Sequence, residues 1–526
     1  MLRYQDIPYQ FNVTSYFVDR NLAEGRGERP ALIVDGRAVS YAELASTANR
    51  IGNVLHELGV RRGQRVLLAC GDGLEFVASW YAVQKIGAVT AEVYTYLQPK
   101  DYAYYLEYTQ AEVLIVDTLT LPGVRVAAKD ARYLRHLLVI GAIDTDLRGN
   151  ELDFEALVSQ APVELQPAPT TRDDIAIWKF TTDSTGAPKA CVHPTHSPLL
   201  SFDWYARGVL GINADDVVLP VPKLFFDFAR DLTALYPFGV GGAGIVFGER
   251  TTADRIFELI ALHRPTILVN VPTMMSAMLS HPDAATQDLS CLRLCTSAGE
   301  ALPAELHRKW SERFGVEVID GIGSSEAYHI YISNRPGQSR PGSVGKVVPG
   351  YTARVVNGDG NELPDGEVGT LEVSGDTVAL EYWEATEKSA TTFPHSMAEY
   401  LGQTRTVRSG DLFTRDADGF FHYRGRADDL LEVSGVWVAP TEIEHCLIGH
   451  QDVLECAVSG YTEEGLTKPR AYVVLRPGAT VTADELIEYT RDRLAPHKRP
   501  RQVRFVDHLP RTVDGKLDRR ALRELA

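Results

Sequence analysis

The hydrophobic pattern in the first two thirds of the chain alternates between helical stripes and short apolar runs. In the segment Tyr41–Leu58, apolar residues recur at the spacing of one helix face, which predicts an amphipathic helix. The run Val66–Ala69 is typical of a buried strand, and a second helix is expected to end near Ile86. Similar runs occur at Val113–Val116, Leu137–Ile140, Ile267–Val271 and Val316–Ile319. Strands that alternate with helices favour an α/β protein with largely parallel or mixed sheets.

The pattern of alternating helices and strands gives way to short glycine-separated runs after about residue 340. Glycines between Gly345 and Gly369 separate short β-like runs, which predicts a compact β-rich section. From Asp428 onward the pattern predicts a small α+β unit, with helices near Thr441–Ile448 and Ala483–Leu494 and strands at Val453–Ser459 and Ala471–Leu475. The charged, glycine-bearing stretch Gly425–Asp429 is typical of an exposed linker.

These patterns predict an α/β plus α+β fold in two domains. Residues 1–425 would form a large N-terminal body of stacked mixed α/β sheets with a β-rich subdomain. Residues 426–429 would be a hinge, and residues 430–526 a small mobile C-terminal domain. The chain of 526 residues is long enough for this division, with 44% hydrophobic and 23% charged residues, as in ordinary globular proteins.

Charge narrows the choice of partner. The sequence has 53 Lys and Arg against 70 Asp and Glu, a net charge of −17. Such a surface repels phosphodiester backbones and anionic lipids, and the only short basic cluster is Lys498–Arg501. We therefore expect neither nucleic acid nor a membrane as partner, whereas a small anionic ligand held by a few local donors is compatible with the composition.

The cysteines and the start of the chain suggest a cytoplasmic protein. The six cysteines form no CxxC pair and are too sparse for a disulfide scaffold, which is typical of thiols in a reducing compartment. The first ten residues, MLRYQDIPYQ, lack the basic and apolar regions of a secretory signal. No uninterrupted apolar stretch reaches the ~18 residues of a membrane helix. We expect a monomer or a homodimer.

The most informative stretch is Thr181–Ala190 (TTDSTGAPKA), which follows the run Ile175–Phe180. Hydroxyl side chains, a glycine and a lysine in a loop at a strand end are suited to wrapping phosphate oxygens. The spacing is not that of a Walker loop. Loops rich in Ser, Thr, Gly and Pro are usually plain turns, so this stretch alone favours a turn.

Further motifs, taken in their order along the chain, favour a phosphate-binding loop over a plain turn. They are Ser297–Pro303 (SAGEALP), Asp320–Glu326 (DGIGSSE), Arg408–Leu412 (RSGDL), Gly425–Asp429 (GRADD) and Pro510–Lys516 (PRTVDGK). The set resembles the core motifs of the adenylate-forming superfamily, which includes acyl-CoA synthetases, luciferases and peptide-synthetase adenylation domains. Within it, the stretches Tyr16–Asn21, Lys223–Phe226 (KLFF) and Ser333–Gly337 are similar to the benzoate–CoA ligase branch. The resemblance covers nearly the whole chain.

The resemblance implies an ATP site assembled from these motifs. The phosphates would be held by Thr181, Thr182, Ser184, Thr185, Gly186 and Lys189. The adenine would be lined by Gly299, Glu300, Ala301, Asp320, Gly321 and Ile322. Ser325 would contact the α-phosphate, Asp411 the ribose hydroxyls, and Arg426 the ribose or a phosphate. Glu326 would bind Mg²⁺, which takes one or two carboxylates together with substrate phosphates.

The implied chemistry needs a mobile cation. A carboxylate attacks the α-phosphorus of ATP, and because both are anionic, a lysine between them positions and neutralises them. Lys516 matches the superfamily's adenylation lysine, and with Glu326 and Lys189 it would form the catalytic set. The small domain would deliver Lys516 and then rotate about Asp428 to present a second face, which carries Glu432 and Gly435.

The expected acyl pocket is unusual for this branch. It would consist of Phe226, Asp227, Phe228, Gly323, Tyr328 and His329. Either Asp227 or Asp231 would recognise an amino or hydroxyl substituent on an aromatic acid, or both aspartates simply pair with Arg230 on a helix. His193 and His196 lack a nearby third ligand, so they do not predict a metal site.

Three positions depart from the family pattern. Asp183 and Ala190 stand where the phosphate loop usually has glycine. An anion ~5 Å from a phosphate costs about 3 kcal/mol at an effective dielectric constant near 20, so Asp183 must point away, bridge through a cation or weaken ATP binding. Glu432 stands where thioester-forming relatives usually carry lysine, which leaves adenylation intact but opens the question of the acceptor.

The leading hypothesis is an ATP-dependent ligase that activates a benzoate-like acid as acyl-AMP, releases pyrophosphate and transfers the acyl group to coenzyme A. An alternative, favoured by Glu432, is an amide synthetase of a natural-product (antibiotic) pathway that transfers the acyl group to an amine. A minor alternative is a non-catalytic adenylate-binding protein, suggested by Asp183. The presence of Glu326, Asp411, Arg426 and Lys516 argues against it. ATP and Mg²⁺ are the expected cofactors, and coenzyme A is the expected co-substrate.

Overall fold

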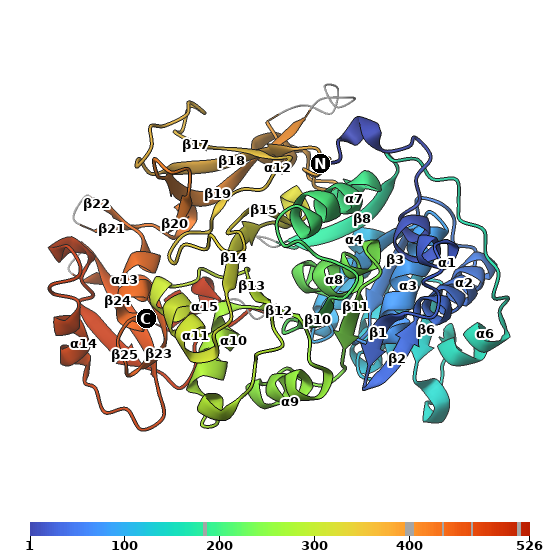
Figure 1. The fold of residues 1–526 in the computed structure, drawn as a ribbon, viewed down its shortest axis with the longest axis horizontal. Helices are drawn as coiled ribbons and strands as arrows, with labels where there is room; N and C mark the ends of the chain where they lie inside the picture. The colour runs from blue at the N-terminus through green and yellow to red at the C-terminus, as the bar shows by residue number, and fades with distance from the viewer. Residues whose placement is uncertain (182–186, 395–403, 434–435, 464–465, 513–516, 526) are drawn as a thin grey trace.

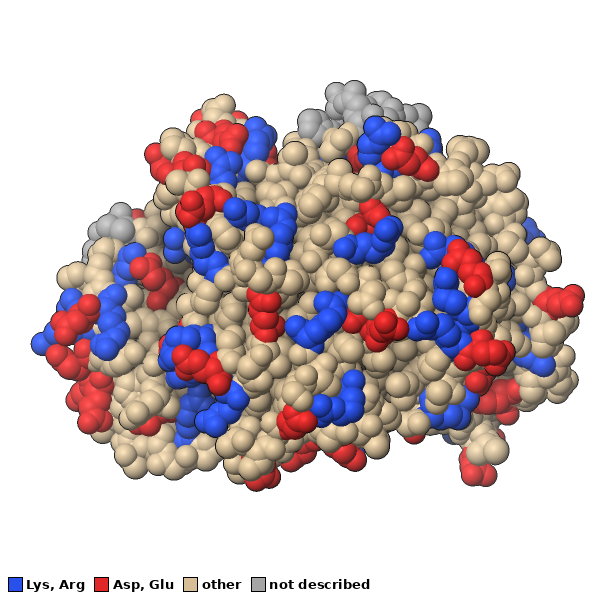
Figure 2. All heavy atoms as spheres, viewed as in Figure 1, with Lys and Arg blue, Asp and Glu red and all other residues tan. Residues whose placement is uncertain are grey.

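The computed structural model describes residues 1–525 except for 182–186, 395–403, 434–435, 464–465 and 513–516. Figure 1 shows a large N-terminal body of helices and sheets, a β-rich layer beside it, and a C-terminal unit at the left of the view. The predicted fold class, α/β plus α+β, is therefore confirmed. Every helix in the described part of the chain is too short or too polar to cross a membrane. On the face seen in Figure 2, acidic and basic side chains are interspersed.

The first sheet has seven strands in the order β7-β6-β5-β3-β4-β8-β9. They are β3 (Arg65–Ala69), β4 (Val89–Glu92), β5 (Val113–Asp117), β6 (His136–Ile140), β7 (Glu151–Asp153), β8 (Ile175–Thr181) and β9 (Lys189–Pro194). Neighbouring strands are parallel except for the β8–β9 pair. Helices α3 (Leu74–Lys85), α4 (Pro99–Thr109) and α5 (Leu121–Ala128) connect successive strands. Successive residues of β3 enter two different cores, which explains its continuous apolar run.

The second sheet has nine strands in the order β16-β15-β14-β13-β12-β10-β11-β1-β2. They are β1 (Pro30–Val34), β2 (Arg37–Ser40), β10 (Val217–Pro220), β11 (Ala243–Val246), β12 (Ile267–Asn270), β13 (Leu294–Ser297), β14 (Val318–Gly323), β15 (Ile330–Ser333) and β16 (Lys346–Val347). Because β12, β13 and β14 are parallel, the loops after their carboxyl ends meet at one edge. This edge brings the SAGEALP and DGIGSSE motifs together.

Helices cover the second sheet. They include α2 (Tyr41–Glu57), α8 (Asp227–Ala234), α9 (Ala253–His263), α10 (Pro272–Ser280) and α11 (Ala304–Phe314). The predicted helix from Tyr41 is confirmed as α2, and Ser40 caps its start by accepting a hydrogen bond from the Glu43 backbone N–H at 3.1 Å. The cap explains why the helix begins where the strand β2 ends.

The β-rich section and the C-terminal unit follow as predicted. The first is an antiparallel sheet of β17 (Thr352–Val356), β18 (Gly369–Gly375), β19 (Arg405–Arg415) and β20 (Phe421–Arg426). The second contains the hairpin β21 (Leu431–Val433) and β22 (Val436–Val438), and a sheet of β23 (Val453–Glu463), β24 (Leu466–Leu475) and β25 (Gln502–Phe505). Helices α13 (Pro440–Ile448), α14 (Ala483–Tyr489) and α15 (Arg519–Glu524) complete it.

Two details of the C-terminal half differ from the sequence-based expectation. Helix α14 ends at Tyr489 rather than Leu494, and the Thr490 hydroxyl next to its end donates to the Ile487 carbonyl oxygen at 2.7 Å. Gly425, expected in an exposed linker, is buried at the end of β20, where its φ of 104° suits only glycine. The exposed part of the junction is the turn Ala427–Asp429, in which the Asp428 side chain is 61% exposed.

The C-terminal unit lies against helix α10 of the body. The Ser276 hydroxyl donates to the Leu454 carbonyl oxygen at 3.4 Å, and Arg476 donates to the Ser280 hydroxyl. Arg511 lies 3.6 Å from Glu300 of the body and 2.8 Å from Glu455 of its own unit. These contacts define the side of the C-terminal unit that faces the predicted nucleotide motifs.

Candidate active site

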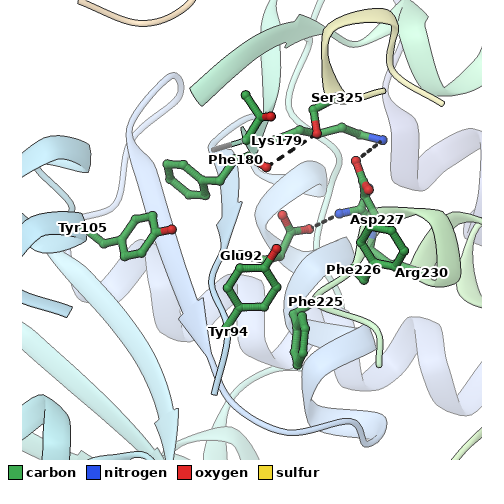
Figure 3. A pocket seen from close by; sticks show the side chains of 11 residues that line it. Glu92, Tyr94, Tyr105, Lys179, Phe180, Phe225, Phe226, Asp227, Arg230 and Ser325 are labelled. Carbon is green, nitrogen blue, oxygen red and sulfur yellow. Dashed lines mark hydrogen bonds and ion pairs between the residues drawn. The ribbon is translucent and has the colours of Figure 1, made fainter. Parts of the chain in front are cut away.

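A cleft opens where the first sheet, helix α8 and the turn after β14 meet (Figure 3). At one end it is lined by Thr181, the last residue of β8, and by Ser325. Elsewhere it is lined by aromatic and charged side chains from β4, α4, β8 and α8 and from the loops after β4 and before α8: Glu92, Tyr94, Tyr105, Lys179, Phe180, Phe225, Phe226, Asp227 and Arg230. The cleft therefore joins predicted phosphate-binding residues to predicted acyl-pocket residues.

The short turn Ser325–Ala327 is held from two sides. The buried His193 donates from Nε2 to the Ser325 carbonyl oxygen at 2.7 Å, and burial lowers the pKa of His193, so the ring is neutral. The Glu326 carbonyl oxygen accepts from the Ala379 backbone N–H at 2.7 Å, and the Glu326 carboxylate accepts from the Tyr382 hydroxyl at 2.7 Å. The carboxylate predicted to bind Mg²⁺ is thus fixed in position before any ligand arrives.

The donor set around Glu326 fits Mg²⁺ better than a metal held by protein alone. In the part of the chain that the structure describes, no group of three His, Cys, Asp or Glu side chains could hold a metal ion. Mg²⁺ does not need such a cage, because it is commonly held by one or two carboxylates and by phosphates of the substrate. Glu326, with one oxygen engaged by Tyr382, retains a second oxygen for that purpose.

The predicted adenine residues lie at the shared edge of β13 and β14. Gly299 has a φ of +87°, and a side chain there would begin 3.5 Å from the Phe226 ring. The Glu300 carboxylate accepts from the Thr273 hydroxyl at 2.6 Å. Asp320 is buried, which raises the pKa of its carboxyl, and its Oδ1 has no hydrogen-bond partner among the described residues. An orphaned buried acceptor of this kind fits a ligand that donates an N–H.

Gly321, Ile322 and Gly323 form the end of β14. A Cβ at Gly323 would lie 2.4 Å from the His329 carbonyl oxygen, so only glycine permits this close approach between the end of β14 and β15. Ala301 is half-buried in the loop after β13.

Asp411 and Arg426 face each other on neighbouring strands. They are directly paired in the register of β19 and β20, and Arg426 Nη1 lies 3.6 Å from Asp411 Oδ1. The structure therefore brings together two residues that the sequence places in separate motifs.

A chain of buried charges lies along the wall of the cleft. Lys179 Nζ lies 3.1 Å from Asp227 Oδ2 and 3.0 Å from Asp231 Oδ2. Arg230 donates to Asp231 Oδ1 at 2.7 Å and also contacts Glu92. Burial acts to raise the pKa of Asp231, but Arg230 and Lys179 prevail and lower it to about 2. The pairing of Asp231 with Arg230, one of the two interpretations of the sequence, is thus realised, with Lys179 as an additional partner.

Lys179 also holds the backbone that follows Glu326. It donates to the Tyr328 carbonyl oxygen at 2.5 Å, and its Nζ lies 3.5 Å from the centre of the Tyr328 ring. Tyr328 has a φ of 78°, which is uncommon for a residue with a side chain. This strained turn connects Glu326 to β15, so Lys179 stabilises the turn that positions the predicted metal ligand.

Four predicted acyl-pocket residues lie outside the lining of the cleft, namely Phe228, Gly323, Tyr328 and His329. Phe228 stacks on His329 with ring centres 5.6 Å apart, and both are buried. They pack behind the cleft wall, whereas Phe226 and Asp227 line the cleft.

The remaining predicted residues lie in the phosphate loop and in the C-terminal unit. Thr182, Ser184, Thr185 and Gly186, together with Asp183, lie outside the described residues, as do Gly435 and Lys516. Lys189 is described and pairs with Thr181 across β8 and β9.

In the C-terminal unit, Arg511 and Leu517 form an isolated antiparallel bridge, and Arg511 lies beside Glu300. Glu432 is exposed on β21.

Two charged residues of the cleft were missed from the sequence, Glu92 and Lys179, and Arg230 was expected only as a partner of the two aspartates. A signal was present, because Lys179 interrupts the apolar run of β8 and Glu92 ends the buried β4. Lysine and glutamate are almost never fully buried unless they are paired, so charges inside buried strands predict buried partners.

Comparison with known proteins identifies the family of the chain. Residues 19–383 match the family model of the AMP-binding enzyme, and residues 442–516 that of the AMP-binding enzyme C-terminal domain. A benzoate–CoA ligase of Thauera aromatica is 39% identical over 98% of this chain and 96% of its own.

Two solved structures are similar over almost the whole chain. The anthranilate CoA ligase AuaEII, in complex with anthranoyl-AMP, has a TM-score of 0.93 and 36% identity and covers 100% of this chain and 99% of its own. A benzoate CoA ligase from Burkholderia xenovorans LB400 has a TM-score of 0.87 and 37% identity, with 98% and 100% covered. The chain therefore belongs to the AMP-binding family of adenylate-forming enzymes, in its benzoate–CoA ligase branch.

Proposed function

We propose that the protein activates an aromatic carboxylic acid with ATP, releases pyrophosphate, and transfers the aryl acyl group to coenzyme A. The observation that carries the proposal is the cleft in which Thr181 and Ser325 adjoin an aromatic wall that includes Phe225 and Phe226. An aryl ring packs against such a wall while its carboxylate lies near the polar end. The full-length similarity to a benzoate–CoA ligase supports the same substrate class.

In the first half-reaction, a carboxylate oxygen of the acid forms a bond to the α-phosphorus of ATP, and the bond from that phosphorus to pyrophosphate breaks. The loop from Thr181 to Lys189 would bind the outer phosphates, and Ser325 the α-phosphate. Lys516 would neutralise the two approaching anions. Mg²⁺ would be held by Glu326 and by phosphate oxygens, and when bound it offsets the charge of the polyphosphate.

In the second half-reaction, the sulfur of coenzyme A attacks the acyl carbon, the bond to AMP breaks, and the thiol proton passes to solvent. We propose a rotation of residues 430–526 against residues 1–425 about Asp428, in the exposed turn. The pose described here places Arg511, near Lys516 in the sequence, beside Glu300, while Glu432 is exposed. This supports a pose suited to the first half-reaction.

Coenzyme A is the acceptor that the relatives favour over an amine. The six cysteines are free thiols, which supports a reducing, cytoplasmic environment.

The test is pyrophosphate exchange with a panel of benzoates. We expect exchange in the wild type and a loss of about 10²- to 10³-fold in Lys516→Ala. Lys498→Ala, which removes an exposed partner of Glu442, is the matched control and should retain exchange. An absence of exchange with every acid would refute the proposal.

The acceptor is then identified by mass spectrometry after addition of coenzyme A or an arylamine. A thioester is expected. Accumulation of amide without thioester would refute coenzyme A as the acceptor, and a gain of thioester formation in Glu432→Lys would show that Glu432 disfavours the thiol.

A further inference from the structure

Five ionisable side chains form a continuous chain along the cleft, and Figure 3 labels all of them except Asp231. In order of contact they are Asp227, Lys179, Asp231, Arg230 and Glu92. Trp80 extends the chain by donating from its indole N–H to Glu92 at 2.5 Å. The side chains of Lys179, Asp231, Arg230 and Glu92 are at most 3% exposed, so this is an interior network rather than a surface one.

The network carries more negative than positive charge. Two cations, Lys179 and Arg230, face three carboxylates, which leaves a formal charge of −1 when all are ionised. The neighbouring His329 does not supply the missing cation, because burial lowers its pKa to about 4. A buried charge without a partner is costly. Burial raises the pKa of Glu92 and the Trp80 indole N–H donates to it, which compensates that end of the network, whereas Asp227 at the other end is reached from the cleft.

The two cations are already engaged within the protein. Lys179 Nζ contacts both aspartates and the Tyr328 carbonyl oxygen. Arg230 contacts Asp231 through Nε and Nη2 and Glu92 through Nη1. Neither is therefore free to hold a second anionic group of a substrate.

The ends of the network are carboxylates, and both line the cleft. The Asp227 side chain is 20% exposed, in contrast to the fully buried Asp231. One Asp227 oxygen contacts Lys179, and the other accepts from the Phe228 backbone N–H at 2.9 Å. A carboxylate oxygen can accept two hydrogen bonds, so Asp227 keeps capacity for a donor in the cleft.

Building on the proposed function, we propose that the substrate is an aromatic acid whose ring carries a hydrogen-bond donor, an amino or hydroxyl group, which binds to Asp227. Such a donor gives the Asp227 carboxylate a further hydrogen bond without taking Lys179 or Arg230 from its present partners. A methyl group of similar size would desolvate Asp227 and return no hydrogen bond, and a second anionic substituent would be repelled.

The test compares ring substituents of similar size in the wild-type protein. Pyrophosphate exchange is measured with 2-, 3- and 4-substituted amino-, hydroxy- and methylbenzoates and with benzoate. A site that hydrogen-bonds a substrate donor rejects the analogue that lacks it strongly, so we expect kcat/KM for the amino or hydroxy acid to exceed that of its methyl isostere by about 100-fold or more at one ring position. Amino and hydroxy acids are separate arms, which distinguishes the two donors.

A methylbenzoate or benzoate that is used within about tenfold of the best amino or hydroxy acid overturns this inference while leaving the proposed ligase function intact. An absence of exchange with every acid overturns both. The two failures are therefore distinguishable.

The assignment to Asp227 is tested with Asp227→Asn, which keeps the side-chain size and removes the charge. We expect the preference for the donor-bearing acid over its methyl isostere to fall about tenfold or more, because hydrogen bonds to charged groups are roughly twice as strong as neutral ones. Thermal unfolding confirms that the variant is folded. If a folded Asp227→Asn keeps the wild-type preference, Asp227 is not the acceptor. If it does not fold, Asp227→Glu, which keeps the carboxylate, must keep the preference, and its loss there overturns the assignment.

Discussion

The Tyr382 hydroxyl donates a hydrogen bond to Glu326 Oε1 at 2.7 Å, and so links the β-rich side of the body to the carboxylate predicted to bind Mg²⁺. Burial and the charge of Glu326 raise the pKa of Tyr382, so the phenol stays protonated and remains a donor.

Tyr382→Phe removes this donor and keeps the ring contact with Phe393, whose centre lies 5.2 Å away. A hydrogen bond of this kind contributes about 1 kcal/mol, so we expect the Mg²⁺ concentration for half-maximal pyrophosphate exchange to rise about fivefold. Tyr41→Phe, which removes another buried hydroxyl that bonds to the Gly242 carbonyl oxygen, is the control. An unchanged Mg²⁺ dependence would exclude a positioning role for Tyr382.

Arg511 of the C-terminal unit lies between Glu300 of the body and Glu455 of its own unit. Because this contact belongs to the pose proposed for the first half-reaction, its loss is expected to slow that half-reaction only. Partly exposed ion pairs contribute up to about 1 kcal/mol, so Arg511→Ala should slow pyrophosphate exchange up to about fivefold. Thioester formation from preformed aryl-adenylate should not slow, because it is proposed to use another pose.

The matched control for this prediction is Arg520→Ala. Arg520 is 79% exposed and contacts Glu524 in the same helix at 3.7 Å. Equal slowing of both half-reactions in Arg511→Ala would contradict a role in the first pose alone.

Lys179→Met tests the stability of the buried network. Removal of the lysine leaves Asp227 and Asp231 with one cation fewer, and breaking a buried pair typically costs about 3–5 kcal/mol of unfolding free energy. Chemical denaturation measures the loss. In the double variant Lys179→Met/Asp227→Asn the original charge balance is restored, so its loss should be smaller than the sum of the two single losses by about 1 kcal/mol or more. Additive losses would show that the two charges do not interact.

The lowered pKa of His329 predicts that the stability of the protein depends on pH. Burial lowers its pKa to about 4, below the value near 6.5 of an unfolded histidine. Between these values the unfolded chain binds the proton and the folded chain does not, so stability is lost as the pH falls from 6.5 to 4, by about 3 kcal/mol. This contribution is fully present above pH 6.5.

Asp72 changes the stability in the opposite direction over an overlapping pH range. Burial raises its pKa to about 6, so the folded chain binds this proton first and stability rises as the pH falls. The diagnostic measurement is therefore a difference: unfolding free energies of the wild type and His329→Gln between pH 4 and 7. The variant should lose less stability than the wild type as the pH falls. Parallel curves would show that His329 is not protonated on unfolding in this range.

Local patterns in the sequence were sufficient for the family, the fold class and most strands. The helix from Tyr41 and the strands near Val66, Val113 and Leu137 follow from spacing alone, because one apolar face or one buried run is a property of neighbouring residues. The order of the motifs likewise predicted the residues that assemble at the edge of β13 and β14. Gly425 was misjudged because its burial results from packing against the C-terminal unit, where a Cβ would lie 3.3 Å from the Thr441 hydroxyl.

The charge network of the cleft was decided by the tertiary structure. Arg230 and Glu92 are 138 positions apart, and Lys179 and Asp231 are 52 apart. The energy of a buried charge depends on which partners lie within a few ångströms, and sequence separation carries no information about that distance. The sequence therefore determined that the chain folds as an adenylate-forming enzyme. Only the fold placed Asp227 at the open end of a buried network, where its carboxylate lines the cleft.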